Sequence, residues 1–428
     1  MTSISSKIQL LTHDRILSRK LLFVLGALVV FRFLSNIPIP AVGNENVAGL
    51  LSNHSANSDI LGFLNLVTGG GLSSISIMML GVGPFITSSI IMQLVTMMSP
   101  KLKAMYHEEG ELGRKKFMQL SRKLTVPLAM IQGSALIIFL QKQGIVGQLD
   151  LFSFVTNIMV VVAGSVMLMW IGELITEYGI GNGVSLIIFA GIVAQIPAKA
   201  VQMIGLYNVS EIPMYIVFLI IVVAATAAVV YITEAERPIP VTYAKQVRGG
   251  QTYGGSQTYL PLRVNQAGVI PIIFALSLMI FPRFLAQFLM GLSNGIAVSV
   301  GNGINAFFNN TFAYSALYFI LVFAFTFFYT AVTFDPESIA TNLQKNGAFI
   351  PGIRPGHATS EYIGVVLTRI TLVGAAFLGL IAVLPFAMQA IAGAGSTFAV
   401  GGTALLIVVS VVLDLVKRIE AQLSMRAY

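Results

Sequence analysis

The sequence contains no cysteine and very little charge. The absence of Cys among its 428 residues excludes disulfides, thiolate metal sites and cysteine nucleophiles. Only 10% of the residues are charged, whereas a soluble domain carries roughly 25%. Hydrophobic residues make up 56% of the chain, and apolar runs of about 20 residues, enough to cross a bilayer core, recur along it. This composition predicts an integral membrane protein.

The motifs of common catalytic sites are also missing. The four histidines lie far apart in predicted loops, without an H-E-x-x-H zinc motif, and no Walker phosphate loop occurs. We therefore predict no enzymatic activity, no metal and no cofactor. No carboxylate or lysine lies at the centre of a predicted span, which counts against an ion-coupled transporter. Two specific functions are kept as alternatives to be tested: a secondary transporter with inverted repeats, and an intramembrane enzyme.

The apolar runs predict ten spanning helices. The stretch from Arg283 to Asn310 is interrupted by Gly and Asn and is predicted to be an external loop or re-entrant piece; if it spans, the count is eleven. The spans are Leu21–Ile37, Leu72–Met98, Leu124–Leu140, Phe154–Ile171, Val184–Ala200, Met214–Ile232, Ala267–Phe281, Phe312–Thr333, Ile363–Leu384 and Gly401–Leu415.

Lysine and arginine predict the orientation. Loops on the side of the two termini hold 20 of them and the opposite loops hold 3, which places both termini in the cytoplasm. Ten spans divide into five and five, so two similar halves would be inverted relative to one another. The predicted division is a cytoplasmic amphipathic N-terminus (1–20), an N-terminal half (21–206), a C-terminal half (207–418) and a cytoplasmic tail (419–428).

Several polar and charged residues lie in or beside the spans. The amides of Gln93, Gln132 and Asn265 are either inert helix–helix contacts or contacts that break when helices part. The charged residues at span boundaries are predicted to be anchors or to form one structural ion pair. They are Arg32, Glu173, Glu177 and Arg369.

Two stretches of the spans have distinctive patterns. Val82, Ile86 and Ile90 share one helix face, which is either an ordinary lipid-facing or core surface or a functional one. Gly81 and Pro84 are predicted to loosen that helix. GIGNGVS (Gly179–Ser185) superficially resembles a phosphate-binding loop, but it joins two membrane helices and predicts a tight turn.

Two loops on the predicted cytoplasmic side are too organised to be linkers. Residues 233–266 contain β-branched and Tyr residues beside Gly-Gly pairs, which predicts a hairpin. Residues 334–362 contain NGAFIPGIRPG, which predicts a stiff turn that presents Arg354. Basic tips of this kind suit RNA or an acidic protein surface, and charge that merely retains the loops in the cytoplasm is the alternative.

A short apolar stub precedes the second span. The sequence DILGFLNLVTGGGLSS (Asp59–Ser74) contains an apolar run of eight residues, Ile60 to Val67. As a helix this run is about 12 Å long, whereas a helix that crosses a bilayer core needs about 30 Å. Three glycines follow it. An interfacial amphipathic helix is one interpretation of this stub.

Several stretches of the sequence resemble a known family. The stretches FIPGIRPG (Phe349–Gly356), ITEYGIGNGVSLIIFAGIVA (Ile175–Ala194), LPLRVNQAGVIP (Leu260–Pro271) and GGTALLIVV (Gly401–Val409) are similar to signature stretches of the SecY family, the bacterial channel subunit of the protein translocon. LLFVLGALVVFRFLSNIPIP (Leu21–Pro40) is similar to the family's first span. The resemblance runs in order along nearly the whole chain.

The resemblance implies an all-α integral membrane protein with ten helices in two inverted, pseudo-symmetric halves, a clamshell around a channel. It implies a constriction of aliphatic side chains, which can dewet and block ions. The ring consists of Val82, Ile86, Ile188, Ile273 and Ile407. The lateral gate, through which membrane segments leave, consists of Thr87, Ile90, Gln93, Gln132, Asn265 and Phe281.

The resemblance also assigns the stub and the loops. The stub becomes a plug helix, about residues 57–71, with Ile60, Leu61, Phe63, Leu64, Leu66 and Val67 packed below the ring and Gly69, Gly70 and Gly71 as its hinge. Arg354 would contact the SecA motor or the ribosome. In the matching stretch of the other loop, RGGQTY, only Arg248 is basic.

The partners and location follow from the family as well. The implied partners are the SecE and SecG subunits, SecA, the ribosome, signal peptides, nascent chains and the lipid bilayer, with SecDF and YidC as additional candidates. The implied location is the bacterial inner membrane. The implied function is to translocate unfolded preproteins and to release membrane proteins laterally.

Overall fold

The structure, a computed structural model, describes residues 15–40, 75–107, 110–142, 144, 146–197, 201, 212–243, 246–248, 251–253, 257–268, 270–290, 295–392 and 401–424. Contacts divide the chain into two compact units. Unit 1 comprises Met1–Tyr215, Ser277–Asn309 and Val411–Tyr428, and unit 2 comprises Ile216–Leu276 and Asn310–Ser410. The division into halves at residues 206 and 207 stays a prediction.

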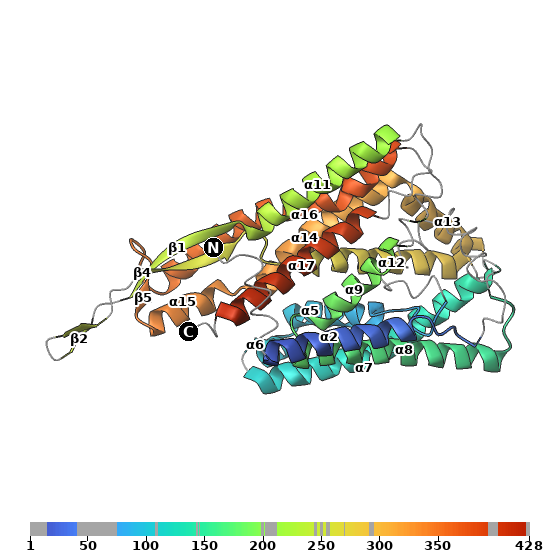
Figure 1. The fold of residues 1–428 in the computed structure, drawn as a ribbon, viewed down its shortest axis with the longest axis horizontal. Helices are drawn as coiled ribbons and strands as arrows, with labels where there is room; N and C mark the ends of the chain where they lie inside the picture. Colours follow the sequence, from blue (N-terminus) through green and yellow to red (C-terminus); the bar gives the residue numbers. More distant parts are fainter. Residues whose placement is uncertain are drawn as a thin grey trace. The chain divides into compact units, whose positions relative to one another are not determined.

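Unit 1 is helical. Its buried core lies where α7 and α8 meet the segments before α5, and includes Ile39, Ile75, Met79, Leu136, Leu140 and Val161. Its helices are α2 (Arg15–Leu34), α5 (Gly83–Met98), α6 (Pro100–His107), α7 (Gly110–Lys142), α8 (Leu151–Tyr178), α9 (Gly183–Val193), α13 (Gly295–Asn309) and the C-terminal parts of α12 (Ile270–Met290) and α17 (Gly401–Ser424) (Figure 1).

Unit 2 combines long helices with a small sheet. α14 and α16 lie side by side, and the rings of Tyr314 and Tyr318 on α14 meet Phe386 of α16 edge-on. The helices are α11 (Ile212–Glu234), α14 (Thr311–Thr333), α15 (Pro336–Lys345) and α16 (His357–Ala392). The strands are β1 (Glu236–Tyr243), β2 (Gln246–Arg248), β3 (Gln251–Tyr253), β4 (Gln257–Arg263) and β5 (Ala348–Phe349).

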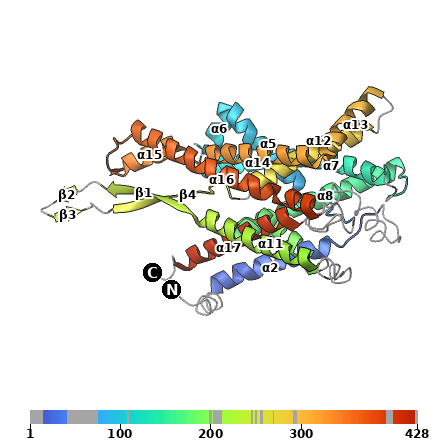
Figure 2. The same ribbon diagram turned by 90° about the horizontal axis from the view of Figure 1, so that it is seen from above.

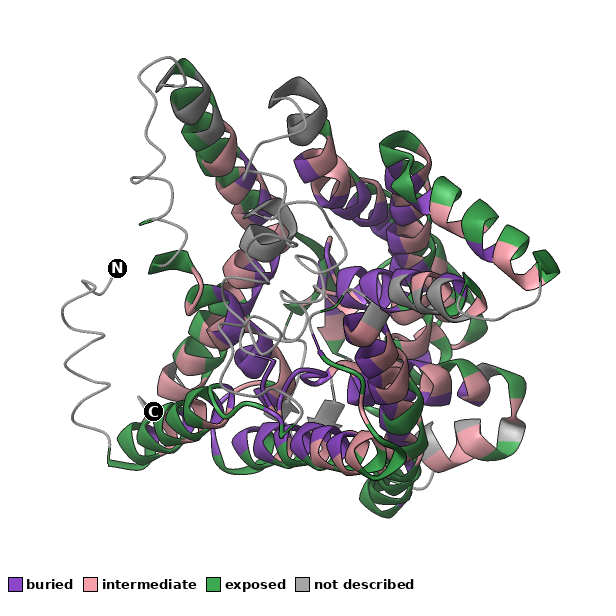
Figure 3. Cartoon of the chain, turned by 90° about the vertical axis from the view of Figure 1, so that its right-hand side faces the viewer, coloured by how far each residue is buried: buried purple, intermediate pink, exposed green. Residues whose placement is uncertain are grey.

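Several helices have the length and apolarity of membrane spans. In the described part of the chain, four helical stretches are long and apolar enough to cross a membrane, and they lie in α7, α8, α14–α15 and α16. α16 has 36 residues, about 54 Å at about 1.5 Å per residue, so it is longer than a bilayer core. Buried residues form stripes along the helices and exposed residues form the opposite stripes (Figure 3). The count of ten spans stays a prediction.

The predicted start of the second span is wrong. α5 begins at Gly83 rather than Leu72, with Pro84 in its first turn, where the missing N–H has no intrahelical acceptor to lose. Residues 75–82 form turns, and Gly81 has a φ of 57°, in the left-handed region that favours glycine. Gly81 and Pro84 therefore mark the entry to α5 and do not loosen a longer helix.

The segment 75–82 is irregular yet buried, and its backbone groups find partners within unit 1. The N–H of Ile39 donates to Ile75 O at 3.1 Å, and the N–H of Ile77 donates to Ile37 O at 2.9 Å. The hydroxyl of Ser165 on α8 donates to Gly81 O at 3.0 Å. Non-helical backbone at membrane depth is tolerated only where protein covers it and supplies such bonds.

Two further boundaries differ from the prediction. The fifth span was expected over Val184–Ala200, but α9 ends at Val193, a two-residue turn follows, and helix resumes at Ile196. The stretch from Arg283 to Asn310 was expected to be an external loop or re-entrant piece, and the seventh span was expected to end at Phe281. Instead α12 continues to Met290 and α13 occupies Gly295–Asn309, so Arg283 lies within a helix.

The predicted plug and its hinge lie outside the described residues. The residues concerned are Ile60, Leu61, Phe63, Leu64, Leu66, Val67, Gly69, Gly70 and Gly71.

Candidate functional site

The apolar face predicted on α5 is buried. Val82 is 1% exposed, Ile86 6% and Ile90 4%. The irregular segment that ends at Val82 fixes the start of this face, because the Ser165 hydroxyl of α8 donates to Gly81 O and backbone bonds join Ile75 and Ile77 to residues 37 and 39. A lipid-facing surface would expose these side chains, so the ordinary lipid-facing interpretation is wrong. Their place in a constriction stays a prediction.

The remaining ring residues come from three other helices. Ile188 lies in α9 of unit 1, whereas Ile273 of α12 and Ile407 of α17 belong to unit 2. All three side chains are buried. All five predicted ring residues are thus aliphatic and buried, and the ring that they would form stays a prediction.

Two of the predicted gate residues have a buried side-chain oxygen without a hydrogen-bond partner among the described residues. Among the described residues, no hydrogen-bond partner is present for Oε1 of Gln93 or Oδ1 of Asn265, although both atoms are buried. Gln132 is half-buried, and the Thr87 hydroxyl donates to Gly83 O of its own helix at 3.0 Å. Phe281 lies in α12, and its side chain is outside the described part. A buried unpaired acceptor costs about 1–3 kcal/mol. Whether these amides are inert helix–helix contacts or contacts that break when helices part stays a prediction.

The GIGNGVS stretch is a tight turn between α8 and α9, as predicted. Gly181 has a φ of 87°, and the Asn182 side chain caps α9 by accepting from the N–H groups of Val184 and Ser185 at 3.0 and 3.3 Å. The Thr176 hydroxyl accepts from Gly183 N–H at 2.9 Å. The N–H groups at the start of α9 are thus occupied by this chain, which leaves them unsuited to a phosphate.

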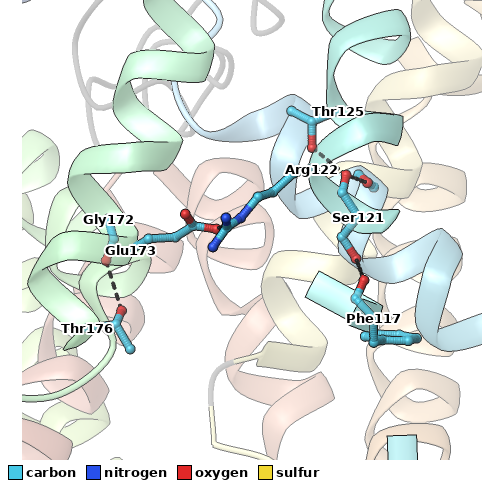
Figure 4. Close-up of polar contacts among 8 residues, drawn as sticks. Phe117, Ser121, Arg122, Thr125, Gly172, Glu173 and Thr176 are labelled. Atoms are coloured by element: carbon cyan, nitrogen blue, oxygen red, sulfur yellow. Dashed lines mark hydrogen bonds and ion pairs between the residues drawn. The ribbon is translucent and has the colours of Figure 1, made fainter. Parts of the chain in front are cut away.

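A charged pair joins α7 to α8 close to that turn. Nε of Arg122 donates to Oε1 of Glu173 at 2.7 Å, and the Glu173 side chain is only 15% exposed (Figure 4). One turn further along α8, the Thr176 hydroxyl donates to Gly172 O at 2.8 Å. The boundary charges were expected to be anchors or to form one structural ion pair, and Glu173 forms such a pair. Its partner, Arg122, was not predicted.

The hairpin predicted in residues 233–266 is present. β1 pairs antiparallel with β4, from Glu236 opposite Arg263 to Thr242 opposite Gln257, and β2 pairs with β3 beyond them (Figure 2). Arg248 lies at the end of β2, opposite Gln251, and its side chain is outside the described part.

The second loop joins the same sheet, which the sequence did not reveal. β5 pairs with β1, so the strand order is β4-β1-β5. Beneath the sheet lies a core from both loops and the start of α16, comprising Ile239, Val241, Leu262, Ala348, Ile350, Ile363, Val366 and Ile370. The only sequence signal was the short apolar run Ala348–Ile350 between Gly347 and Pro351.

Arg354 lies on an exposed turn that follows β5. Gly352 and Gly356 flank it with φ values of 83° and 98°, conformations that glycine adopts without strain. The hydroxyl of the buried Thr359 donates to Arg354 O at 2.9 Å. The turn is therefore held at both its sheet end and its helix end, and it presents the guanidinium outward, as the sequence predicted.

Comparisons with known proteins agree with this fold. The family model for SecY matches residues 76–416. The chain is 41% identical to the protein translocase subunit SecY of Streptomyces scabiei and 40% identical to that of Mycobacterium tuberculosis, with 96% of each chain covered in both comparisons.

Solved structures give the same result for the fold. "The structure of a protein conducting channel" superposes with a TM-score of 0.64 at 20% identity, covering 94% of this chain and 91% of that one. "Sec61 in the Canine ribosome-channel complex from the endoplasmic reticulum" superposes with a TM-score of 0.58 at 19% identity. The fold is thus that of a membrane-embedded protein-conducting channel. Because the relatives above match it over nearly its whole length, the chain belongs to the SecY family of protein translocase subunits.

Proposed function

We propose that this chain forms the channel through which unfolded preproteins cross the bacterial plasma membrane and from which membrane segments pass sideways into lipid. The observation that carries the proposal is identity of about two residues in five to protein translocase subunits over 96% of the chain. The chain supplies the path and has no catalytic activity of its own, so a partner supplies the energy.

The five buried aliphatic residues form the constriction in this proposal. Val82, Ile86, Ile188, Ile273 and Ile407 offer no hydrogen-bonding groups, so their ring fits any passing side chain without holding it. The same lack of polar groups lets a narrow ring shed water and exclude ions. The plug residues of the stub, Ile60 to Val67, would close the funnel beneath it, with Gly69 to Gly71 as the hinge.

The gate in this proposal uses amides that are unsatisfied in one conformation. The buried acceptors on Gln93 and Asn265 favour rearrangement, because a move that gives them partners or water recovers the cost of leaving them unpaired. Thr87, Ile90, Gln132 and Phe281 complete the proposed gate. An arriving signal peptide, itself apolar, would part the helices without having to break strong polar bonds at these two positions.

The three-stranded sheet is the proposed docking surface for SecA or the ribosome. Arg354 is exposed on a turn whose backbone is held by β5 and Thr359, so a partner meets this basic residue at a defined place on the surface. Arg248 lies on the arm formed by β2 and β3. Lysine and arginine are concentrated on the same side of the predicted membrane topology, which supports a cytoplasmic location for this sheet and for both termini.

The remaining partners are SecE and SecG as small membrane subunits, with SecDF and YidC as candidates for later steps. The direct test is co-purification from the native membrane under mild detergent. Recovery of a small partner with one to three spans, together with SecA or ribosomes, is the expected result. Recovery of the chain alone under conditions that preserve a known translocon would contradict the proposal.

The ring has its own test. Ile86→Asn and Ile407→Asn should make the resting membrane leak ions or relax the requirement for a good signal sequence, because an amide in the ring retains water. Leu219→Asn, on an exposed face of α11, is the matched control. Unchanged ion conductance and unchanged signal stringency in both ring variants would contradict the ring assignment.

A further inference from the structure

Helix α13 packs one face against the end of α12. A Cβ at Gly301 would lie 2.7 Å from Cγ of Met290 and 2.8 Å from O of Ala286, so only glycine permits this approach. Phe308 lies seven residues after Gly301 on α13. Its backbone oxygen accepts from Nη2 of Arg283 on α12 at 3.2 Å, and the Arg283 guanidinium lies 5.5 Å from the centre of its ring. α13 therefore runs back along the end of α12, antiparallel to it.

The rest of α13 presents two different stripes to its surroundings. Residues three, four or seven apart share a helix face, and these spacings relate the members of each stripe. The apolar stripe is exposed and consists of Ile296 (77% exposed), Val300 (49%) and Phe307 (47%). The polar stripe is exposed and uncharged, and it consists of Ser299, Asn302 and Asn309.

The neighbouring sequence places α13 at a membrane boundary. Asn310 follows it directly and caps α14 by accepting from the N–H groups of Phe312 and Ala313 at 3.1 and 3.3 Å. α14 has 23 residues, about 34 Å, close to the thickness of a bilayer core of about 30 Å. The first turn of α14 is thus where the chain enters the hydrocarbon region, and α13 ends two residues earlier.

The charge pattern indicates what covers the apolar stripe. Between Arg263 and Asp335 the sequence holds a single charged residue, Arg283. A helix that faces water usually carries charges of both signs, and so does the rim of a protein interface. Uncharged polar groups beside an apolar stripe are instead compatible with the bilayer interface, where Ser and Asn reach headgroups and water.

We propose that α13 lies against the bilayer, with the apolar stripe of Ile296, Val300 and Phe307 on the acyl chains and the polar stripe on the headgroups. Arg283 fits this boundary, since its stem is apolar and its guanidinium rests on Phe308. The α12–α13 hairpin would then anchor this end of α12 in the membrane. This contact requires a chain that spans a membrane and does not depend on protein translocation.

Because the chain has no cysteine, single-cysteine variants need no prior substitutions. Ile296→Cys and Val300→Cys report on the apolar stripe, and Ser299→Cys and Asn302→Cys are matched controls on the same helix. Each variant is labelled with bimane, reconstituted in phosphatidylcholine–phosphatidylglycerol nanodiscs with its co-purifying subunits, and titrated with iodide or with doxyl-labelled phospholipid.

The expected result is that doxyl lipid quenches the two apolar positions several-fold more than the two polar ones, and that iodide shows the reverse order. Equal iodide quenching at all four positions would overturn the proposal, because the stripe would then face water. Protection of the apolar positions from both quenchers would also overturn it, because a protein surface would then cover them. Retained monodispersity of each labelled variant excludes misfolding.

Discussion

Ala348 of β5 lies directly opposite Tyr243 of β1 in an antiparallel pair. The two residues come from different long loops, separated by α12, α13, α14 and α15 in the sequence. A change in one loop therefore reaches the other through the sheet and the core beneath it. The docking surface that we propose is one folded body built from both loops.

Thr359 should act as a positioning residue for Arg354. Thr359→Val removes the donor to Arg354 O, a bond worth about 1 kcal/mol, and we expect affinity for SecA or ribosomes to fall about fivefold. The midpoint of thermal unfolding should change little. Thr368→Val is the control, because the Thr368 hydroxyl donates to Gly364 O of its own helix. Equal effects of the two substitutions on partner binding would show that Thr359 has no special role.

Gly183→Ala should destabilise the junction of α8 and α9. The added Cβ would overlap Gly172 O, and overpacking of this kind costs about 1–3 kcal/mol. Gly364→Ala on α16 is the control, since its nearest neighbour would be Pro336 Cγ at 4.0 Å, and alanine favours a helix. Thermal unfolding in detergent measures both. A Gly183→Ala variant as stable as the control would mean that α8 and α9 separate easily.

The Arg122–Glu173 pair should couple more strongly than an exposed pair. A double-mutant cycle with Arg122→Gln and Glu173→Gln is expected to give about 1 kcal/mol, the upper end for exposed pairs, because Glu173 is largely buried. The Arg418–Asp414 pair, exposed on both sides and one helical turn apart, should give about 0.3–0.5 kcal/mol. If the two cycles agree, burial of Glu173 adds nothing to the pair.

The stub should move during translocation if it is a plug. A cysteine at Phe63 and a second one at the membrane boundary of a neighbouring span should crosslink in the resting channel and fail to crosslink while a preprotein occupies it. The absence of native cysteine removes competing disulfides. A yield of crosslink that does not change during translocation would leave the stub as an interfacial helix.

Uninterrupted apolar runs and local turn chemistry predicted much of the fold. The helices α8, α14 and α16 contain the predicted spans Phe154–Ile171, Phe312–Thr333 and Ile363–Leu384, because runs of that length have few alternatives in a bilayer. The GIGNGVS turn was predictable as well, since its glycines and the Asn182 cap act within one turn of the chain.

Features that depend on distant partners were not predictable. Residues 75–82 have the apolar composition of a membrane helix, and their bonds to Ile37, Ile39 and Ser165 stabilise an irregular path that the sequence did not reveal. β5 has two residues and exists because β1 offers it a partner. The ring residues are ordinary aliphatic side chains on separate helices, so composition did not distinguish them and only the family resemblance assigned them.

The central claim is that this chain conducts proteins across a membrane. The most direct test reconstitutes it with its co-purifying subunits in proteoliposomes, adds SecA, ATP and a preprotein, and measures the preprotein fraction that becomes resistant to external protease. Our account predicts resistance that requires ATP, SecA and an intact signal sequence and that is lost when detergent opens the vesicles. Vesicles that never protect the preprotein, yet accumulate a small solute when an ion gradient is imposed, would contradict it and favour a secondary transporter.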